Sequence, residues 1–283
     1  MKKAISTLII MLLTNTLSSV IAQNTGQGVV LGEKHHVVST INGKTYELII
    51  QLPYSYQTDT TKHYPVVYFC DGYYDFPLFT SIYGNLIYDQ RITECFLVGF
   101  SYVGENVDYG PLRFYDYLPT YSDKQKFGGG AAEYLKIVEQ DFIPYIETNF
   151  RIDSGWRALG GSSAGGMFCL YSLFTKPDLF NAYMAISPAA EWDNHWLFKY
   201  EETFSKSNST LPVSLYMTAA EKEFPENPGY VNSIKEFNQV LSTRKYTNLH
   251  YKFRVLDNAT HAGSKPEGYT RGMQFIFEPM IEH

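Results

Sequence analysis

Strand-like and helix-like segments alternate along most of the chain. Strand-like runs, the first two apolar on both faces, lie at residues 66–69, 95–100, 157–159, 182–186, 213–217 and 251–256. Apolar residues recur at helical spacing over residues 131–148, 164–174, 231–242 and 269–281. Runs that are apolar on both faces suit parallel strands inside a sheet, and their alternation with helices indicates an α/β fold. We therefore predict a mostly parallel twisted sheet with helices on both faces.

Two further patterns refine this fold. Residues 36–41 and 46–50 are β-like runs joined across Asn42-Gly43, a strong hairpin signal. We expect this hairpin to form an antiparallel N-terminal edge of the sheet. Pro144 lies inside the first predicted helix and predicts a kink or a local break there.

Residues 1–22 have the pattern of a secretory signal peptide. Lys2 and Lys3 precede a short apolar stretch, and Val20 and Ala22 supply the small residues that signal peptidase requires. The apolar stretch is too short to span a bilayer comfortably, although an uncleaved anchor is the alternative. We predict an exported protein, periplasmic or secreted.

Composition limits the other possibilities. The chain has 283 residues, of which 45% are hydrophobic, and a net charge of −6. It has no basic run of the kind that a nucleic-acid partner favours, and no later segment is apolar enough to span a membrane. We predict that residues 23–283 form a single domain, with Cys70, Cys95 and Cys169 as buried small hydrophobes. The sequence does not indicate an oligomeric state.

A candidate nucleophile lies in the segment Gly160-Gly161-Ser162-Ser163-Ala164-Gly165-Gly166, which contains G-x-S-x-G. A predicted strand precedes it and a predicted helix follows it, which is the context that a nucleophile elbow needs. Glycines at 161 and 165 leave room for the strand and helix to approach. The free N–H of Ala164 at the helix start would then bind an oxyanion. The alternative is a glycine-rich helix start used for packing or phosphate binding, but no lysine follows the glycines.

A serine nucleophile needs a base, and in this fold the acid and then the histidine follow the serine along the chain. His261 lies in the loop after the last predicted strand, where the base belongs, whereas His195, His250 and His283 lie elsewhere. The acid should follow the strand at 213–217. Glu221 and Glu223 are both candidates there.

The rim of this site has weaker signals. The loop Asp71-Gly72-Tyr73-Tyr74 follows the third strand, and Gly72 would let the backbone turn so that the N–H of Tyr73 completes an oxyanion hole. A plain turn is the alternative. Residues 102–121 are rich in tyrosine and are predicted as a loop over the site. Within this loop Arg113 would grip an anionic substrate group or form a structural salt bridge.

From about residue 40 onward the chain resembles the putative-esterase family of α/β-hydrolases, which includes siderophore-trilactone esterases, S-formylglutathione hydrolases, feruloyl esterases and mycolyltransferases. The similar segments are residues 64–72, Arg113 with 116–120, 142–146, Ser187-Pro188 with Trp192 soon after, 215–223 and 261–263. The resemblance implies an α/β-hydrolase fold, Glu223 as the acid and Trp192 as a substrate contact. Two departures are Ser162, where the family commonly has histidine, and Ala220, where it has glycine. The second leaves the acid open, since a Ser–His pair suffices in some siderophore esterases.

These observations predict a serine carboxylic-ester hydrolase that forms an acyl-enzyme. The expected substrate is a siderophore-type, carbohydrate-linked or other small ester, and we expect no metal and no cofactor. An acyltransferase would use the same acyl-enzyme, and a non-catalytic protein that binds a glycan or another ligand would use the same fold.

Overall fold

The computed structural model describes residues 31–281 of the chain. The predicted signal peptide, residues 1–22, lies outside the described residues, and a single domain over 23–283 stays a prediction. Within the described part, no helix has the length and apolar character needed to cross a membrane.

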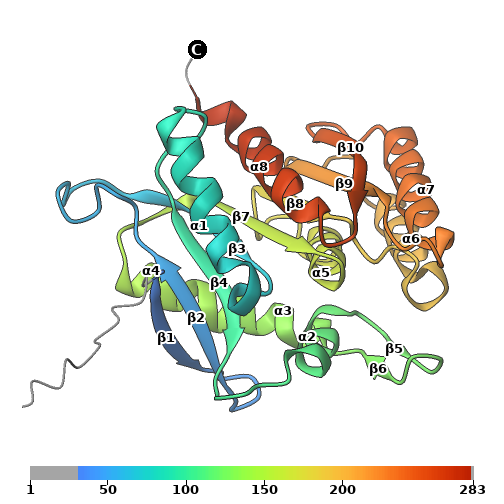
Figure 1. The fold of residues 1–283 in the computed structure, drawn as a ribbon, viewed down its shortest axis with the longest axis horizontal. Helices are drawn as coiled ribbons and strands as arrows, with labels where there is room; N and C mark the ends of the chain where they lie inside the picture. Colours follow the sequence, from blue (N-terminus) through green and yellow to red (C-terminus); the bar gives the residue numbers. More distant parts are fainter. Residues whose placement is uncertain (1–30, 282–283) are drawn as a thin grey trace, which may run out of the picture. The chain divides into compact units, whose positions relative to one another are not determined.

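An eight-stranded sheet forms the centre of the fold, in the order β1-β2-β4-β3-β7-β8-β9-β10 (Figure 1). Its strands are β1 (Glu33–Val38), β2 (Thr45–Gln51), β3 (Tyr64–Phe69), β4 (Phe96–Tyr102), β7 (Ile152–Ser162), β8 (Ala182–Ile186), β9 (Ser214–Lys222) and β10 (His250–Thr260). The six strands from β4 to β10 are parallel, whereas β2 runs antiparallel to both β1 and β4. The prediction of a mostly parallel sheet with an antiparallel edge hairpin is confirmed.

Helices cover both faces of the sheet. They are α1 (Gly72–Tyr88), α2 (Tyr109–Tyr117), α3 (Ala131–Ile137), α4 (Ile143–Asn149), α5 (Ala164–Thr175), α6 (Trp192–Ser205), α7 (Pro228–Arg244) and α8 (Ser264–Phe277). Helices α1 and α8 pack against each other over one face, and α5 packs on β7 and β8 over the other (Figure 1). A small hairpin of β5 (Tyr121–Ser122) and β6 (Phe127–Gly128) lies outside the main sheet.

Strand β3 illustrates why its sequence is apolar throughout. Side chains alternate across a strand, so Val66 and Tyr68 enter the core under α5 while Val67 and Phe69 enter the core under α1 and α8. All four are essentially inaccessible to solvent. A strand covered on both faces therefore shows no polar alternation.

The predicted break at Pro144 is present. Helix α3 passes into a π-helical turn over Val138–Phe142, and α4 begins at Ile143 with the proline in its first turn. Proline has no N–H to donate and its ring crowds the preceding turn. The π turn directly before it accommodates both constraints.

Two predicted loops proved to be helices. Helix α1 begins at Gly72, and α2 occupies the middle of the tyrosine-rich segment 102–121. Gly72 and Pro77 are poor helix formers, so local propensity argued against α1. Packing outweighs propensity here, because α1 buries Phe76, Phe79 and Tyr83 at helical spacing.

The turn from β7 into α5 depends on backbone contact between two glycines. A Cβ atom added to Gly161 would overlap the backbone of Gly165, and one added to Gly165 would lie 2.8 Å from Cβ of Cys70. The predicted need for glycine at these two positions therefore has a steric cause.

We expect Gly161→Ala to lower the free energy of unfolding by roughly 3 kcal/mol, because the strand or the helix must shift to admit the methyl group. Gly110→Ala in α2 is the control, since the nearest atom to its Cβ would lie 3.6 Å away. That change should alter stability by less than about 1 kcal/mol. Denaturant unfolding of both variants measures the difference, and equal stability would contradict the steric argument.

Candidate active site

The predicted site residues come together at one edge of the sheet. Ser163 follows β7, Glu223 follows β9, His261 follows β10, and Gly72 comes shortly after β3. These four strands are parallel, so their carboxyl ends lie at the same edge. This edge is where open α/β sheets place their ligands.

Ser163 has an unusual backbone conformation, with φ 59° and ψ −118°. Its N–H donates to the carbonyl of Ile186 at 3.0 Å, and its carbonyl accepts from Met167 and Ala189. These bonds hold a conformation that a non-glycine residue rarely adopts. Ala164 is the first residue of α5, so its N–H has no acceptor within the helix.

His261 is bonded to Glu223. Its Nδ1 lies 2.6 Å from one carboxylate oxygen of Glu223, and the other oxygen accepts from the N–H of Ala220 at 2.7 Å. The Glu223 side chain is completely buried. The imidazole also packs against the rings of Phe224 and Tyr230. Such a carboxylate fixes both the tautomer and the orientation of the ring.

The structure separates the two candidate acids. Glu221 is exposed and accepts from the backbone N–H of Asn258 at 2.7 Å, a bond that lowers the pKa of the Glu221 carboxyl group. The Glu221 carboxylate therefore joins the end of β9 to the end of β10. Of the two carboxylates, that of Glu223 contacts His261.

The remaining histidines have other environments. His250 stacks on Phe275 at the start of β10, and His195 lies in α6. His283 lies outside the described residues.

Within residues 31–281, the Ser163 hydroxyl makes no hydrogen bond to His261. Its neighbour is Tyr230, whose pKa is raised by burial, while the Ser163 hydroxyl opposes that rise. Tyr230 belongs to α7 and was not predicted as a site residue. Nothing in its local sequence distinguishes it from other tyrosines.

The second predicted oxyanion contact lies at the start of α1. Tyr73 is in the first turn of this helix, so its N–H has no acceptor within it. The sharp turn is made by Asp71, with φ 58°, and not by Gly72 as predicted. Glycine is needed at 72 because an added Cβ would lie 2.5 Å from the backbone of Gly99 on β4.

Arg113 forms the structural salt bridge that was one of its two predicted roles. Its Nε and Nη2 donate to the two carboxylate oxygens of Asp71 at 2.8 and 2.7 Å. Burial lowers the pKa of Arg113, but the adjacent Asp71 carboxylate raises it more, so the guanidinium stays charged. The pair ties α2 to the start of α1, and Lys265 of α8 bonds Asp75 of α1 at 2.9 Å.

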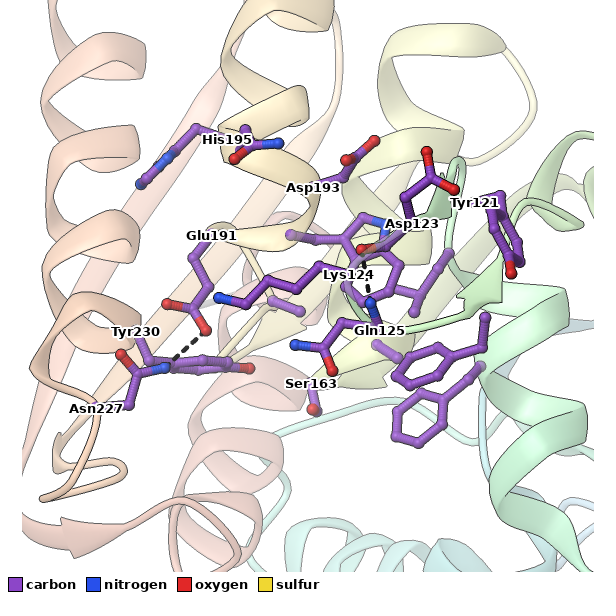
Figure 2. A pocket seen from close by; sticks show the side chains of 18 residues that line it. Tyr121, Asp123, Lys124, Gln125, Ser163, Glu191, Asp193, His195, Asn227 and Tyr230 are labelled. Carbon is purple, nitrogen blue, oxygen red and sulfur yellow. Dashed lines mark hydrogen bonds between the residues drawn. The ribbon is translucent and has the colours of Figure 1, made fainter.

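A cavity of about 910 Å³ opens beside Ser163. Figure 2 shows Ser163 with Tyr230, Glu191 and Asn227 on one side and residues of the β5–β6 hairpin on the other. Its lining residues are Phe114, Leu118, Tyr121–Gln125, Phe127, Ser163, Ala164, Ala189, Glu191–His195, Asn227 and Tyr230. The predicted contact Trp192 is among them, stacked on Phe127 with ring centroids 5.3 Å apart. Sequence reasoning missed the hairpin, because its two-residue strands leave no periodic signal.

Comparison with known proteins gives a consistent picture. The model of a family described as "Putative esterase" matches residues 39–264. The chain is similar to ferri-bacillibactin esterase BesA of Bacillus subtilis, with 26% identity over 270 residues, 89% of this chain and 92% of that protein. A siderophore enterobactin esterase of Emericella nidulans is 31% identical over 134 residues, 41% of this chain and 44% of its own. Among solved structures, the BES protein from Bacillus cereus has a TM-score of 0.77 and 26% identity, covering 88% of this chain and 97% of that one.

A buried carboxyl group in α2 predicts a pH dependence of stability. Burial raises the pKa of Asp116 to about 7, although the Tyr102 hydroxyl donates to it at 3.0 Å. Its ordinary value is 3.8, so between about pH 4 and pH 7 the folded state binds more protons than the unfolded state. The free energy of unfolding should therefore fall as pH rises through this range.

We expect Asp116→Asn to reduce that fall by about 1.4 kcal/mol for each unit of pKa elevation removed. Asp123→Asn is the control, because that side chain is 97% exposed. Denaturant unfolding at pH 4.5 and pH 8 measures the effect. An unchanged pH dependence in Asp116→Asn would show that the carboxyl group is not elevated.

Proposed function

Since the chain belongs to the family described as "Putative esterase" and is a carboxylic ester hydrolase, we propose that it is a serine esterase with Ser163 as nucleophile. His261 acts as general base and Glu223 orients it. The single observation that carries this proposal is the 2.6 Å bond between His261 and the buried Glu223, at the same sheet edge as the strained Ser163.

In the first half-reaction His261 removes the proton of the Ser163 hydroxyl as its oxygen attacks the ester carbonyl. The imidazolium that forms is stabilised by the Glu223 carboxylate at Nδ1. A hydrogen bond between Ser163 and His261, which the structure of the described residues does not have, forms when substrate binds, since catalytic contacts are often completed only in the substrate complex. Protonation of the leaving alkoxide by His261 then releases the alcohol and leaves an acyl-enzyme.

The negative charge on the carbonyl oxygen needs donors that are already in place. The N–H groups of Ala164 and Tyr73 are suited to this role, because each belongs to the first turn of a helix and lacks an intrahelical acceptor. Water activated by His261 next attacks the acyl group. Its proton returns to Ser163 by way of His261, and the acid product leaves.

A siderophore-type small ester is the substrate class that we favour. BesA is named a ferri-bacillibactin esterase and the Emericella relative a siderophore enterobactin esterase, and the cavity beside Ser163 offers aromatic surfaces in Phe127 and Trp192. Such surfaces stack on flat acyl groups. A carbohydrate-linked aromatic ester would use the same surfaces and is the alternative. Export through the predicted signal peptide would place the enzyme outside the cytoplasm with such esters.

A fluorophosphonate probe tests the nucleophile. We expect the wild-type protein to be labelled and Ser163→Ala to remain unlabelled, because no other hydroxyl lies in the strained turn between β7 and α5 next to the cavity. Mass spectrometry locates the adduct. A folded wild-type protein that resists labelling would refute the proposal, and a panel of trilactone, feruloyl and p-nitrophenyl esters then ranks the substrates.

A matched pair of variants tests the acid. Glu223→Gln should lower kcat by roughly a hundredfold or more, because the amide can hold His261 in the wrong tautomer and cannot stabilise its charged form. Glu221→Gln should keep near wild-type activity, since its exposed carboxylate bonds the backbone N–H of Asn258 at the strand end. Steady-state kinetics on a p-nitrophenyl ester compares them. Equal losses would contradict the assignment of the acid, and a larger loss in Glu221→Gln would reverse it.

A further inference from the structure

Two buried serines connect the end of β8 to the loop that carries His261. The Ser187 hydroxyl donates to the Ser264 hydroxyl at 3.1 Å, and the Ser264 hydroxyl donates to the backbone carbonyl of His261 at 2.7 Å. Neither serine is accessible to solvent. A carbonyl oxygen can only accept, so Ser264 must donate to it and Ser187 must donate to Ser264. The direction of the chain of hydrogen bonds is therefore fixed.

Tyr230 closes this chain into a circuit around the imidazole. Its hydroxyl donates to the carbonyl of Ser187 at 2.9 Å. Its ring stands perpendicular to the His261 ring, at 88° with centroids 5.3 Å apart. The circuit thus holds His261 at its backbone through Ser264 and at its ring through Tyr230.

The same circuit is tied to the backbone of the nucleophile. Ser187 directly follows Ile186, whose carbonyl accepts the N–H of Ser163 at 3.0 Å. Two residues further on, the N–H of Ala189 donates to the carbonyl of Ser163 at 3.1 Å. Ser187 itself has φ 44°, a left-handed conformation that surrounding bonds must maintain.

The bond from Glu223 reaches the ring of His261 at Nδ1 and does not fix the backbone of the loop that carries this residue. A displacement of the base by about 1 Å costs roughly a hundredfold in rate. We propose that Ser187 and Ser264, closed by Tyr230, are positioning residues that fix His261 relative to Ser163. This inference rests on the proposed serine-esterase function.

The test compares Ser264→Ala, Ser187→Ala and the double variant with Ser39→Ala. Ser39 is the control, because its buried hydroxyl also donates a hydrogen bond, to Asp141 at 2.8 Å, but it lies between β1 and β2, at the other end of the strand order from β8–β10. Each protein is assayed for kcat and KM on a p-nitrophenyl ester, for its rate of fluorophosphonate labelling, and for its melting temperature. All assays are run well below the lowest melting temperature.

We expect Ser264→Ala and Ser187→Ala to lower kcat and the labelling rate by about 10- to 100-fold, with KM within about twofold. The double variant should lose little more than either single variant, since one chain of hydrogen bonds is broken in all three. Ser39→Ala should keep wild-type kcat. Tyr230→Phe keeps the ring and removes only the hydroxyl. It should likewise lower kcat and leave KM nearly unchanged, and it replaces a serine variant that does not fold.

A lower melting temperature with wild-type kcat and labelling rate in Ser264→Ala would overturn the inference, because the serines would then be structural only. An equal kcat loss in Ser39→Ala would overturn it as well. These results differ from a failure of the proposed function. If that function is wrong, the wild-type protein itself does not react with the fluorophosphonate.

Discussion

The close approach of β7 and α5 is the constraint on which the rest of the structure depends. Gly161 and Gly165 touch through their backbones, so the chain reverses from strand to helix within the single residue Ser163. Helix α5 is mostly apolar and is buried from Ala164 to Phe174, which anchors the turn in the core. The strained serine is therefore maintained by the packing of the central strand and the central helix, and the turn itself is not stable in isolation.

Charged pairs hold the surrounding elements against this turn. Asp71 and Arg113 join α1 to α2, while Asp75 and Lys265 join α1 to α8. Burying a charge is costly unless it is paired, so each pair contributes little net stability. Its main effect is to fix the relative positions of the two helices that it joins. Both pairs include residues from the beginning of α1, where the N–H of Tyr73 lies. Helix α1, which carries the proposed oxyanion donor, is thus fixed by ion pairs to α2 and to α8, the helix that follows the His261 loop.

Much of this arrangement was predictable from sequence, because the order of strands and helices along the chain and the turn at Ser163 are both visible in local residue patterns. The apolar runs of β3 and β4 and the glycine-rich turn at Ser163 have strong local signals, and the position of His261 after the last strand follows from chain order. Helices α1 and α2 were missed since their stability comes from tertiary packing. The choice between Glu223 and Glu221 depends on where β9 ends. The strand ends at Lys222, so Glu223 follows it and reaches His261, whereas Glu221 is still part of the strand. The contacts of Tyr230 and Ser264 join distant segments and have no local signature.

The position of β10 has a consequence for how activity is lost on heating. This strand lies at the outer edge of the sheet and pairs with β9, and its last residue directly precedes His261. Edge elements open by local fluctuations whose free energy is smaller than that of global unfolding. Fraying of β10 would displace His261, the proposed base, while the strands around Ser163 stay protected from hydrogen exchange. On the proposed mechanism, we therefore expect inactivation to precede the cooperative melting of the sheet, with the outermost strand setting the thermal limit of the site.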